Sequence, residues 1–309
     1  MKLLVTYNIP RAPFQELPSD WEITFPEGEA FSKAELLRLL PDHDILLSIF
    51  HAPVDKEIIN AGKKLKLISN YGVGYNNIDI QYAREKGISV TNTPQAVNTP
   101  TAELTMTLLL SAARRVAECN LRLRKEKESM WGTMQNLGFG LEGKTLGIIG
   151  MGNIGKNVAR KAEAFGMKII YYNDRTEVPA YHRTDLNTLL KESDFISLHT
   201  PLTPLTHHLI GPEELALMKN TVILVNTARG SVVDEKALAE ALKNKQIAGA
   251  ALDVFEDEPH IAEALYLLDN VVLTPHIGTA TIDARIAMAR EALDNIKNFL
   301  KGTPTNIVN

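Results

Sequence analysis

The stretch Gly143–Gly155 reads GKTLGIIGMGNIG, which predicts a buried strand that runs into a glycine-rich turn and then a helix. Gly150, Gly152 and Gly155 form the pattern GxGxxG. The first glycine permits a tight turn, the second lets the backbone approach a pyrophosphate, and the third lets the helix touch the strand. Glycines also mark ordinary turns, but the strand before and the helix after favour a dinucleotide-binding loop.

The residues around this loop bear on the choice of cofactor. Asn153 and Ile154 open the helix, where free backbone N–H groups are expected to face the phosphates. The second strand ends in Asn173, Asp174 and Arg175. An acid at this point binds the ribose 2′-OH of NAD, whereas an arginine accommodates the 2′-phosphate of NADP. Because an acid and an arginine stand side by side, these residues alone leave the choice open.

Short apolar runs alternate with amphipathic stretches on both sides of this segment, which predicts parallel sheets with helices on both faces. The expected strands are Leu3–Thr6, Ile45–Ser48, Leu67–Ser69, Ile88–Val90, Thr145–Ile149, Lys168–Tyr172, Phe195–Leu198, Thr221–Val225, Ala248–Val254 and Val271–Thr274. Two series of this kind predict an α/β protein with two doubly wound parallel-sheet domains, a flavodoxin-like substrate domain and a Rossmann cofactor domain. We expect the first to comprise residues 1–97 and 284–309, and the second residues 98–283. The active site is expected in a cleft between them.

Helix signals divide the chain further. Ser32 and Glu35 form a capping pair for a helix over Ser32–Leu40. A long apolar helix is expected to follow Thr99 as its N-cap, with Pro100 at its first position. An amphipathic helix over Ile282–Leu300 closes the chain.

The bulk composition excludes several classes of protein. The 309 residues are 45% hydrophobic and 23% charged, and the net charge of −4 argues against nucleic acid as a partner. The single cysteine, Cys119, excludes an intrachain disulfide and suits a reducing compartment. No apolar run reaches the roughly 18 residues of a membrane span, and the first residues do not resemble a signal peptide. We therefore expect a cytoplasmic protein with no membrane partner.

Three polar residues follow strands of the second half, where a cofactor-bound substrate is expected: Arg229, Glu258 and His276. Arginine binds a carboxylate through two parallel hydrogen bonds. Histidine exchanges a proton near neutral pH, and a neighbouring glutamate favours the protonated ring and fixes its orientation. These three residue types are those that reduction of a 2-oxo acid requires.

Three other histidines show no pattern that indicates catalysis or metal binding. His207 and His208 are adjacent, and His260 lies in a polar loop, but no metal-ligand spacing links them. We therefore expect surface residues and no metal site.

Five motifs in this order resemble the D-2-hydroxyacid dehydrogenase family over essentially the whole chain, and the glyoxylate and hydroxypyruvate reductase branch in particular. They are NYGVGYNNID at 70–79, GMGNIG at 150–155, NTARG at 226–230, ALDVFEDEP at 251–259 and TPHIG at 274–278. Asn76 stands where the family commonly has aspartate. The resemblance implies hydride transfer between NAD(P)H and a small 2-oxo acid to give a D-2-hydroxy acid. It also implies a homodimer built largely on the cofactor domain.

The resemblance also assigns roles to single residues. Arg229 would bind the substrate carboxylate and carbonyl, His276 would be the acid/base, and Glu258 its partner. The backbone N–H groups of Val73 and Gly74 would hold the carboxylate. Further residues would line the cofactor site together with Arg229 and His276: Thr101, Thr227, Ala228, Asp253 and Gly278.

Compared with the family, the cofactor residues favour NADP(H). The position of the usual NAD-selecting acid falls on Asn173, and Arg175 falls where NADP-preferring members have arginine. Asp174 either repels a phosphate or pairs with Arg175.

Three alternatives share this scaffold. Phosphoglycerate dehydrogenase needs extra cations, which the stretch Ser48–Pro53 does not supply. Formate oxidation needs no proton exchange with an alcohol, so the presence of both His276 and Glu258 argues against a formate dehydrogenase. A nicotinamide-sensing transcriptional corepressor would use the same fold as a binding module, and a turnover assay distinguishes it from an enzyme.

Overall fold

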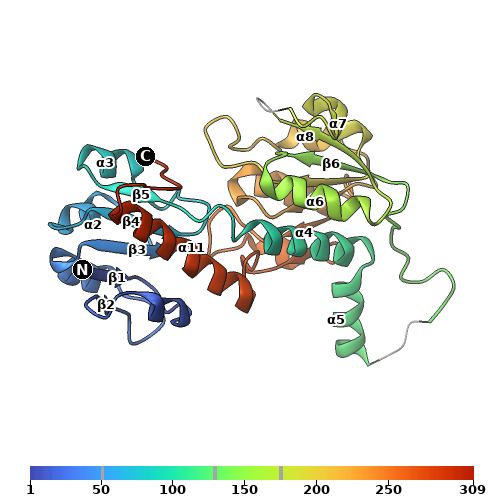
Figure 1. Ribbon diagram of the computed structural model, residues 1–309. Helices are drawn as coiled ribbons and strands as arrows, with labels where there is room; N and C mark the ends of the chain where they lie inside the picture. Colours follow the sequence, from blue (N-terminus) through green and yellow to red (C-terminus); the bar gives the residue numbers. More distant parts are fainter. Residues whose placement is uncertain (50–51, 128–130, 174–176) are drawn as a thin grey trace. The chain divides into compact units, whose positions relative to one another are not determined.

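A computed structural model describes residues 1–49, 52–127, 131–173 and 177–309 (Figure 1). The chain divides into two compact units, the first formed by Met1–Val97 with Thr279–Asn309 and the second by Asn98–Gly278. Each unit contains an all-parallel sheet with helices on both faces, so the predicted doubly wound α/β architecture is confirmed. The second boundary lies after Gly278, whereas the sequence suggested residue 283.

The first unit has a five-stranded sheet in the order β2-β1-β3-β4-β5. This is the flavodoxin-like order, in which the chain starts near the middle of the sheet and winds outward in both directions. The strands are β1 (Lys2–Val5), β2 (Glu22–Thr24), β3 (Ile45–Ile49), β4 (Leu67–Tyr71) and β5 (Ser89–Thr91). Every residue of β3 and β4 is buried, as expected for strands covered on both faces.

Helices from both ends of the chain cover this sheet. One face packs against residues of η1 (Ala12–Glu16) and α11 (Ile282–Leu300). The other face packs against α1 (Lys33–Leu39), η2 (Leu40–Asp42), α2 (Lys56–Ala61) and α3 (Ile80–Glu85). The C-terminal helix is therefore part of the same hydrophobic core as the N-terminal strands.

The second unit has a seven-stranded sheet in the order β12-β11-β10-β9-β6-β7-β8. The chain starts at β6, winds to β8 on one side, and then crosses to β9 on the other, which is the Rossmann order. The switch point, where ligands bind in such sheets, lies between β6 and β9. The strands are β6 (Thr145–Ile149), β7 (Lys168–Tyr172), β8 (His182–Arg183), β9 (Phe195–Leu198), β10 (Ile223–Asn226), β11 (Gly249–Leu252) and β12 (Val271–Leu273).

Two layers of helices enclose this sheet. One layer is α4 (Asn98–Ala113) and α6 (Asn153–Glu163), which lie side by side in Figure 1. The other contains α7 (Leu186–Glu192), α8 (Pro212–Leu217), η3 (Gly230–Val232), α9 (Glu235–Lys243) and α10 (Glu263–Tyr266). The remaining helix, α5 (Val116–Glu126), follows α4 and points away from the sheet (Figure 1).

Local signals predicted some helix boundaries correctly and one incorrectly. The capping box of α1 is confirmed, because the Glu35 N–H donates to Ser32 Oγ and the Ser32 N–H donates to Glu35 Oε2. The assignment of Thr99 as N-cap is wrong, because α4 begins at Asn98 and Pro100 is its third residue. Proline is tolerated there because first-turn N–H groups have no acceptor within the helix.

Two short edge strands, β2 and β8, were not expected from the sequence. Neither has an apolar run, because an edge strand of two or three residues buries little surface. No helix within the described ranges is long and apolar enough to cross a bilayer.

Candidate active site

The glycine-rich loop after β6 has the geometry that a pyrophosphate requires. Gly150 has a φ of +99°, and a Cβ there would lie 2.6 Å from the backbone carbon of His199. A Cβ on Gly155 would lie 2.3 Å from the Gly150 carbonyl oxygen, so helix α6 touches the loop. A Cβ on Gly152, in contrast, would have no atom within 4 Å. The loop is thus tightly packed at Gly150 and Gly155 and open at Gly152. The open position lies beside the N-terminus of α6, which has no side-chain cap and begins with Asn153 and Ile154.

The end of β7 is joined to this loop. Asn173 Oδ1 accepts a hydrogen bond of 2.7 Å from the Met151 N–H, and the Asn173 carbonyl accepts one of 2.9 Å from Arg183 Nη2. The Asn173 side chain therefore helps to shape the glycine-rich loop. Asp174 and Arg175 lie outside the described residues.

Arg229 lies in a turn after β10 that its neighbours hold in place. The buried side chain of Asn226 donates to the Arg229 carbonyl at 2.9 Å and accepts from the Ala228 N–H at 3.0 Å. A Cβ on Gly230 would lie only 1.9 Å from the backbone carbon of Phe255. The turn that carries Arg229 therefore packs directly against the segment after β11.

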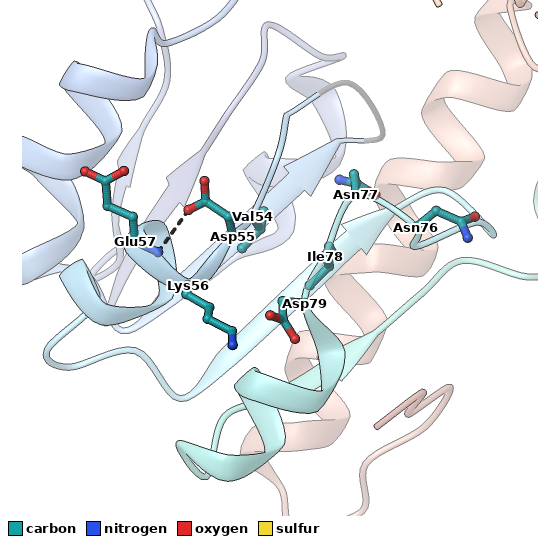
Figure 2. A pocket seen from close by; sticks show the side chains of 8 residues that line it. All are labelled: Val54, Asp55, Lys56, Glu57, Asn76, Asn77, Ile78 and Asp79. Carbon is teal, nitrogen blue, oxygen red and sulfur yellow. Dashed lines mark hydrogen bonds between the residues drawn. The ribbon is translucent and has the colours of Figure 1, made fainter. Parts of the chain in front are cut away.

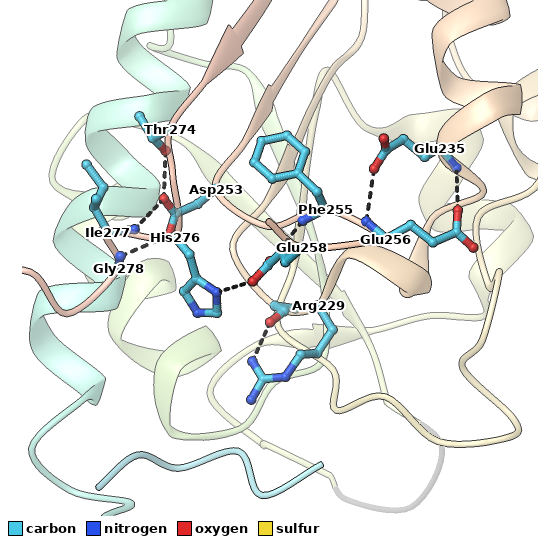
Figure 3. A network of polar contacts seen from close by, with 11 residues as sticks. Arg229, Glu235, Asp253, Phe255, Glu256, Glu258, Thr274, His276, Ile277 and Gly278 are labelled. Atoms are coloured by element: carbon cyan, nitrogen blue, oxygen red, sulfur yellow. Dashed lines mark hydrogen bonds and ion pairs between the residues drawn. The ribbon is translucent and has the colours of Figure 1, made fainter. Parts of the chain in front are cut away.

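Glu258 and His276 form a close pair on that side of the unit (Figure 3). His276 Nδ1 lies 2.8 Å from Glu258 Oε2, and Glu258 Oε1 accepts a hydrogen bond of 3.0 Å from the Phe255 N–H. An ionised carboxylate can only accept, so Nδ1 carries a proton and donates it to Glu258. Both side chains are about one-quarter exposed, at 29% for His276 and 24% for Glu258, so the pair remains reachable from solvent.

Asp253 fixes the loop that carries His276. Its buried carboxylate accepts hydrogen bonds from Thr274 Oγ1 at 2.7 Å and from the backbone N–H groups of Ile277 and Gly278 at 2.8 Å (Figure 3). Its carbonyl also accepts from the His276 N–H at 2.9 Å. His276 itself has a φ of +52°, a region that residues other than glycine adopt uncommonly. Asp253 therefore offsets the cost of this conformation with hydrogen bonds on both sides of His276.

Burial sets the electrostatics of this cluster. It lowers the pKa of the Arg229 guanidinium, and the charge of Glu258 opposes that shift. Arginine still stays protonated at any physiological pH. Burial also raises the pKa of the Asp253 carboxyl, and the hydrogen bonds from Thr274 and the loop N–H groups oppose this. The second unit thus brings one permanent cation close to a carboxylate–imidazole pair.

A group of small residues lies beside the cluster at the start of α4. Thr227 Oγ1 lies 2.8 Å from Thr105 Oγ1, which donates to the Thr101 carbonyl at 2.8 Å. A Cβ on Gly278 would lie 3.5 Å from Thr101 Oγ1. The structure therefore brings together Thr101, Thr227 and Gly278, and Ala228 follows Thr227 in the same turn. Sequence reasoning missed Thr105, which links α4 to the turn after β10.

In the first unit, Val73 and Gly74 lie in the loop after β4. The carbonyls of this loop are held by side-chain amides: Asn70 Nδ2 donates to Gly72 and Gly74, and Asn92 Nδ2 donates to Val73. In the described part of the chain, neither the Val73 nor the Gly74 N–H has an acceptor. Sequence reasoning missed Asn70 and Asn92, which turn the carbonyls aside and leave these two N–H groups available.

A pocket of about 590 Å³ in the same unit is lined by residues 54–57 and 76–79 (Figure 2). Its two aspartates already have structural roles. Asp55 caps α2 by accepting from the Glu57 and Ile58 N–H groups, and Asp79 caps α3 by accepting from the Tyr82 N–H. This pocket therefore has its acids engaged in the fold and offers no catalytic pair.

Comparison with known families agrees with this geometry. Residues 106–278 match the model of the D-isomer specific 2-hydroxyacid dehydrogenase NAD-binding domain. The chain belongs to this family. A glyoxylate reductase from Thermococcus litoralis is 47% identical to this dehydrogenase over 320 residues, which cover 100% of this chain and 96% of the relative.

Solved structures agree over the whole dehydrogenase chain. A protein from Thermus thermophilus has a TM-score of 0.94 and 42% identity, and the match covers 100% of both chains. An NADPH-dependent glyoxylate/hydroxypyruvate reductase from Sinorhizobium meliloti, in complex with NADP and malonate, has a TM-score of 0.86 and 31% identity. That match covers 99% of this chain and 96% of the other.

The chain is thus an NAD(P)-dependent 2-hydroxyacid dehydrogenase, as the motifs predicted. The residues of the glycine-rich loop fit the cofactor. Gly152 has no side chain and leaves open space beside the N-terminus of α6, where a pyrophosphate would bind.

Substitution of two glycines in the loop should distinguish an effect on folding from an effect on cofactor binding. We expect Gly155→Ala to lower the free energy of unfolding by about 1–3 kcal/mol, because its Cβ would overlap the Gly150 carbonyl. Gly152→Ala should leave the melting temperature unchanged and weaken NAD(P)H binding, because its Cβ enters space that the phosphates need. Thermal melts and cofactor fluorescence titrations measure the two effects. Equal loss of stability in both variants would contradict this assignment.

Proposed function

We propose that this dehydrogenase reduces short 2-oxo acids such as glyoxylate and hydroxypyruvate to 2-hydroxy acids of the D configuration. The observation that carries the proposal is the 2.8 Å contact between His276 Nδ1 and Glu258 Oε2, in the unit that contains Arg229 and the dinucleotide loop. The name of the Thermococcus relative, a glyoxylate reductase, supports the choice of substrate.

Binding of the substrate carboxylate is assigned to Arg229 and to the N–H groups of Val73 and Gly74. Arg229 carries a permanent charge, and its planar guanidinium matches a carboxylate. The side-chain amides of Asn70 and Asn92 support the role of the Val73 and Gly74 N–H groups. They donate to the carbonyls of this loop and leave its N–H groups as donors. These donors are backbone groups and need no reorganisation when an anion binds.

Proton transfer is assigned to His276. As the carbonyl carbon is reduced, negative charge develops on the carbonyl oxygen, and a proton on Nε2 neutralises it. Glu258 holds the ring in place through its contact with Nδ1. In the oxidative direction the same nitrogen accepts the hydroxyl proton. The bound nicotinamide supplies the hydride in reduction and receives it in oxidation.

Cofactor contacts are assigned to the glycine-rich loop with Asn153 and Ile154, to the end of β7, and to the small residues beside α4. The last group comprises Thr101, Thr227, Ala228, Asp253 and Gly278. Their grouping around the turn after β10 supports this assignment. Asp253 also acts as a positioning residue, because its carboxylate accepts three hydrogen bonds that hold the His276 loop.

Substrate size is the first test. We expect kcat/KM for glyoxylate and hydroxypyruvate to exceed that for 3-phosphohydroxypyruvate by at least about tenfold, which corresponds to about 1.4 kcal/mol of transition-state binding. The reason is that the stretch Ser48–Pro53 contributes no Arg or Lys to hold a phosphate. A panel of 2-oxo acids, assayed with NADH and with NADPH, measures this. Equal or better use of the phosphorylated acid would instead support a phosphoglycerate dehydrogenase.

The same assays with NADH and NADPH measure cofactor preference, and we propose that the enzyme prefers NADPH. Asn173 replaces the usual acid, Arg175 follows it two residues later in the sequence, and Arg183 Nη2 lies 2.9 Å from the Asn173 carbonyl. Arg175→Ala should raise the KM for NADPH and leave that for NADH unchanged. Arg183→Ala is the companion variant. An effect in Arg183→Ala alone would move phosphate recognition to β8, and a wild-type preference for NADH would overturn the assignment.

Removal of the proton donor is the second test. His276→Ala should lower kcat by roughly 10²–10⁴-fold and leave the Kd for NADPH unchanged. Glu258→Gln should also lower kcat, but less than His276→Ala does, because the single amide oxygen can replace only one of the two carboxylate oxygens that contact His276 Nδ1 and the Phe255 N–H. His182→Ala, at an exposed position in β8, is the matched control. The assignment fails if His276→Ala keeps a near-normal kcat or if Glu258→Gln has the wild-type kcat.

We also propose that the enzyme is a cytoplasmic homodimer. The apolar run 99–114 and the Arg/Lys/Glu stretch after it are the segments whose sequence favours an interface, and the buried residues of the first of them, α4, pack within the second unit. Exposed apolar side chains lie instead on α5 and on residues 131–139: Val116, Leu121, Leu123, Trp131, Met134, Leu137 and Phe139. Trp131 is 86% exposed, and burial of such a surface against a second copy is favourable.

Light scattering tests the dimer. The wild type should have about twice the 34.2 kDa mass of one chain at micromolar concentration. The double variant Leu121→Glu/Trp131→Glu should shift the mass toward one chain, because it would bury two carboxylates in the interface. Leu267→Glu is the control, since Leu267 is also highly exposed but lies elsewhere on the second unit. A monomeric wild type, or equal masses for all three proteins, would contradict the proposal.

A further inference from the structure

Two histidines and a glutamate on the second unit form a cluster outside the proposed active site. One ring nitrogen of His207, one of His208 and one carboxylate oxygen of Glu256 all lie within 4.8 Å of one another. His208 Nε2 is 2.5 Å from Glu256 Oε1, and the two imidazole rings stack with their centroids 4.0 Å apart. Imidazole and carboxylate groups are the usual protein ligands of zinc and its neighbours in the first transition row.

The backbone holds His208 in place. The His208 N–H donates to the Ser231 carbonyl at 2.8 Å, and the Ile210 N–H donates to the Val232 carbonyl at 3.1 Å. His208 has a φ of +50°, so this turn adopts a conformation that side chains rarely favour. The segment that carries the two histidines is therefore tied to the residues directly after Arg229.

Glu256 is held from a different element. Its N–H donates to Glu235 Oε2 at 3.0 Å, and its own Oε2 accepts from the Glu235 N–H at 3.5 Å (Figure 3). Glu235 is buried, and its other oxygen accepts from the Ala262 N–H at 2.9 Å. Because Gly230 packs against the Phe255–Glu256 peptide, the backbone beneath the cluster has little freedom to shift.

We propose that His207, His208 and Glu256 bind one divalent transition-metal ion of the zinc type, with water completing its coordination. Zinc lies about 2.0–2.2 Å from nitrogen and oxygen ligands, so tetrahedral ligands are about 3.3 Å apart. The direct His208–Glu256 contact therefore opens by less than an ångström to admit the ion. The exposed side chains of His207 and Glu256 can make this change while their backbone stays fixed.

The bound ion links two segments of the second unit that are distant in the sequence, the turn 206–210 and the segment between Phe255 and Glu258. The bond from the His208 N–H to the Ser231 carbonyl, and the packing of Gly230 on the Phe255–Glu256 peptide, connect both to the residues after Arg229. A ligand that binds only the folded state raises its stability. The site therefore acts as a clamp that stabilises the part of the unit from which Arg229 and Glu258 arise.

Metal titration of the full-length, tag-free protein after chelator treatment tests the proposal. Calorimetry with Zn²⁺ should give one ion per chain, Co²⁺ should produce visible absorption bands, and saturating Zn²⁺ should raise the melting temperature. His207→Ala, His208→Asn and Glu256→Gln should each raise the Kd at least about tenfold and remove the rise in melting temperature. Asparagine is chosen at position 208 because it tolerates a positive φ.

His260→Ala is the matched control, because His260 is a highly exposed histidine whose Nδ1 lies 3.8 Å from the neighbouring acid Asp257. This variant should bind Zn²⁺ as the wild type does. The proposal is overturned if the wild type shows no saturable binding. It is also overturned if the three ligand variants bind as tightly as the wild type, or if only His260→Ala loses the ion. Circular dichroism of each metal-free variant separates loss of a ligand from loss of folding.

Discussion

The buried carboxylate of Asp253 accepts three hydrogen bonds from the loop after β12, and its carbonyl accepts a fourth from the His276 N–H. These bonds hold His276 at a positive φ. The same loop brings the His276 imidazole to Glu258, with Nδ1 2.8 Å from Oε2. A carboxylate that is itself buried would be costly without such donors, so the loop and the acid stabilise each other.

The second constraint is the close contact between Gly230 and the Phe255–Glu256 peptide. It brings the turn that carries Arg229 against the segment that carries Glu258, although the two residues are far apart in sequence. Parallel strands make this possible, since β10 and β11 are neighbours and their carboxyl ends lie at one edge of the sheet. The Arg229 guanidinium and the Glu258 carboxylate thus arise from segments that follow adjacent strands of one sheet.

Much of this arrangement was predictable from the sequence, because periodic burial and capping are local signals. The strands β6, β7 and β9 and the helix α11 have the predicted bounds, since long apolar runs and strong end signals define them. The edge strands β2 and β8 were missed because they bury too little to leave a pattern. Asn70, Asn92 and Thr105 were missed for another reason. Asn92 and Thr105 bond to groups 19 and 122 residues away, and Asn70 bonds to carbonyls of its own loop, whose conformation no spacing in the sequence reports.

The same limit applies to the histidine and glutamate cluster, because His208 and Glu256 are 48 residues apart. Adjacent histidines carry no metal-binding signature without the third ligand. Only the packing of the crossovers after β9, β10 and β11 brings the three side chains together. Sites of this kind follow from topology and are absent from local patterns.

The first unit is built from both ends of the chain, and α11 supplies one side of its core through Met288, Ala289, Ala292, Leu293 and Ile296. During synthesis, the strands β1 to β5 leave the ribosome long before this helix exists. One face of their sheet has no α11 to cover it while the whole second unit is translated. The second unit, which is continuous in sequence, can fold before the first is complete. A helix made after the whole second unit therefore completes a domain that was started before it, and a chaperone that shields apolar surface can act on that domain during the interval.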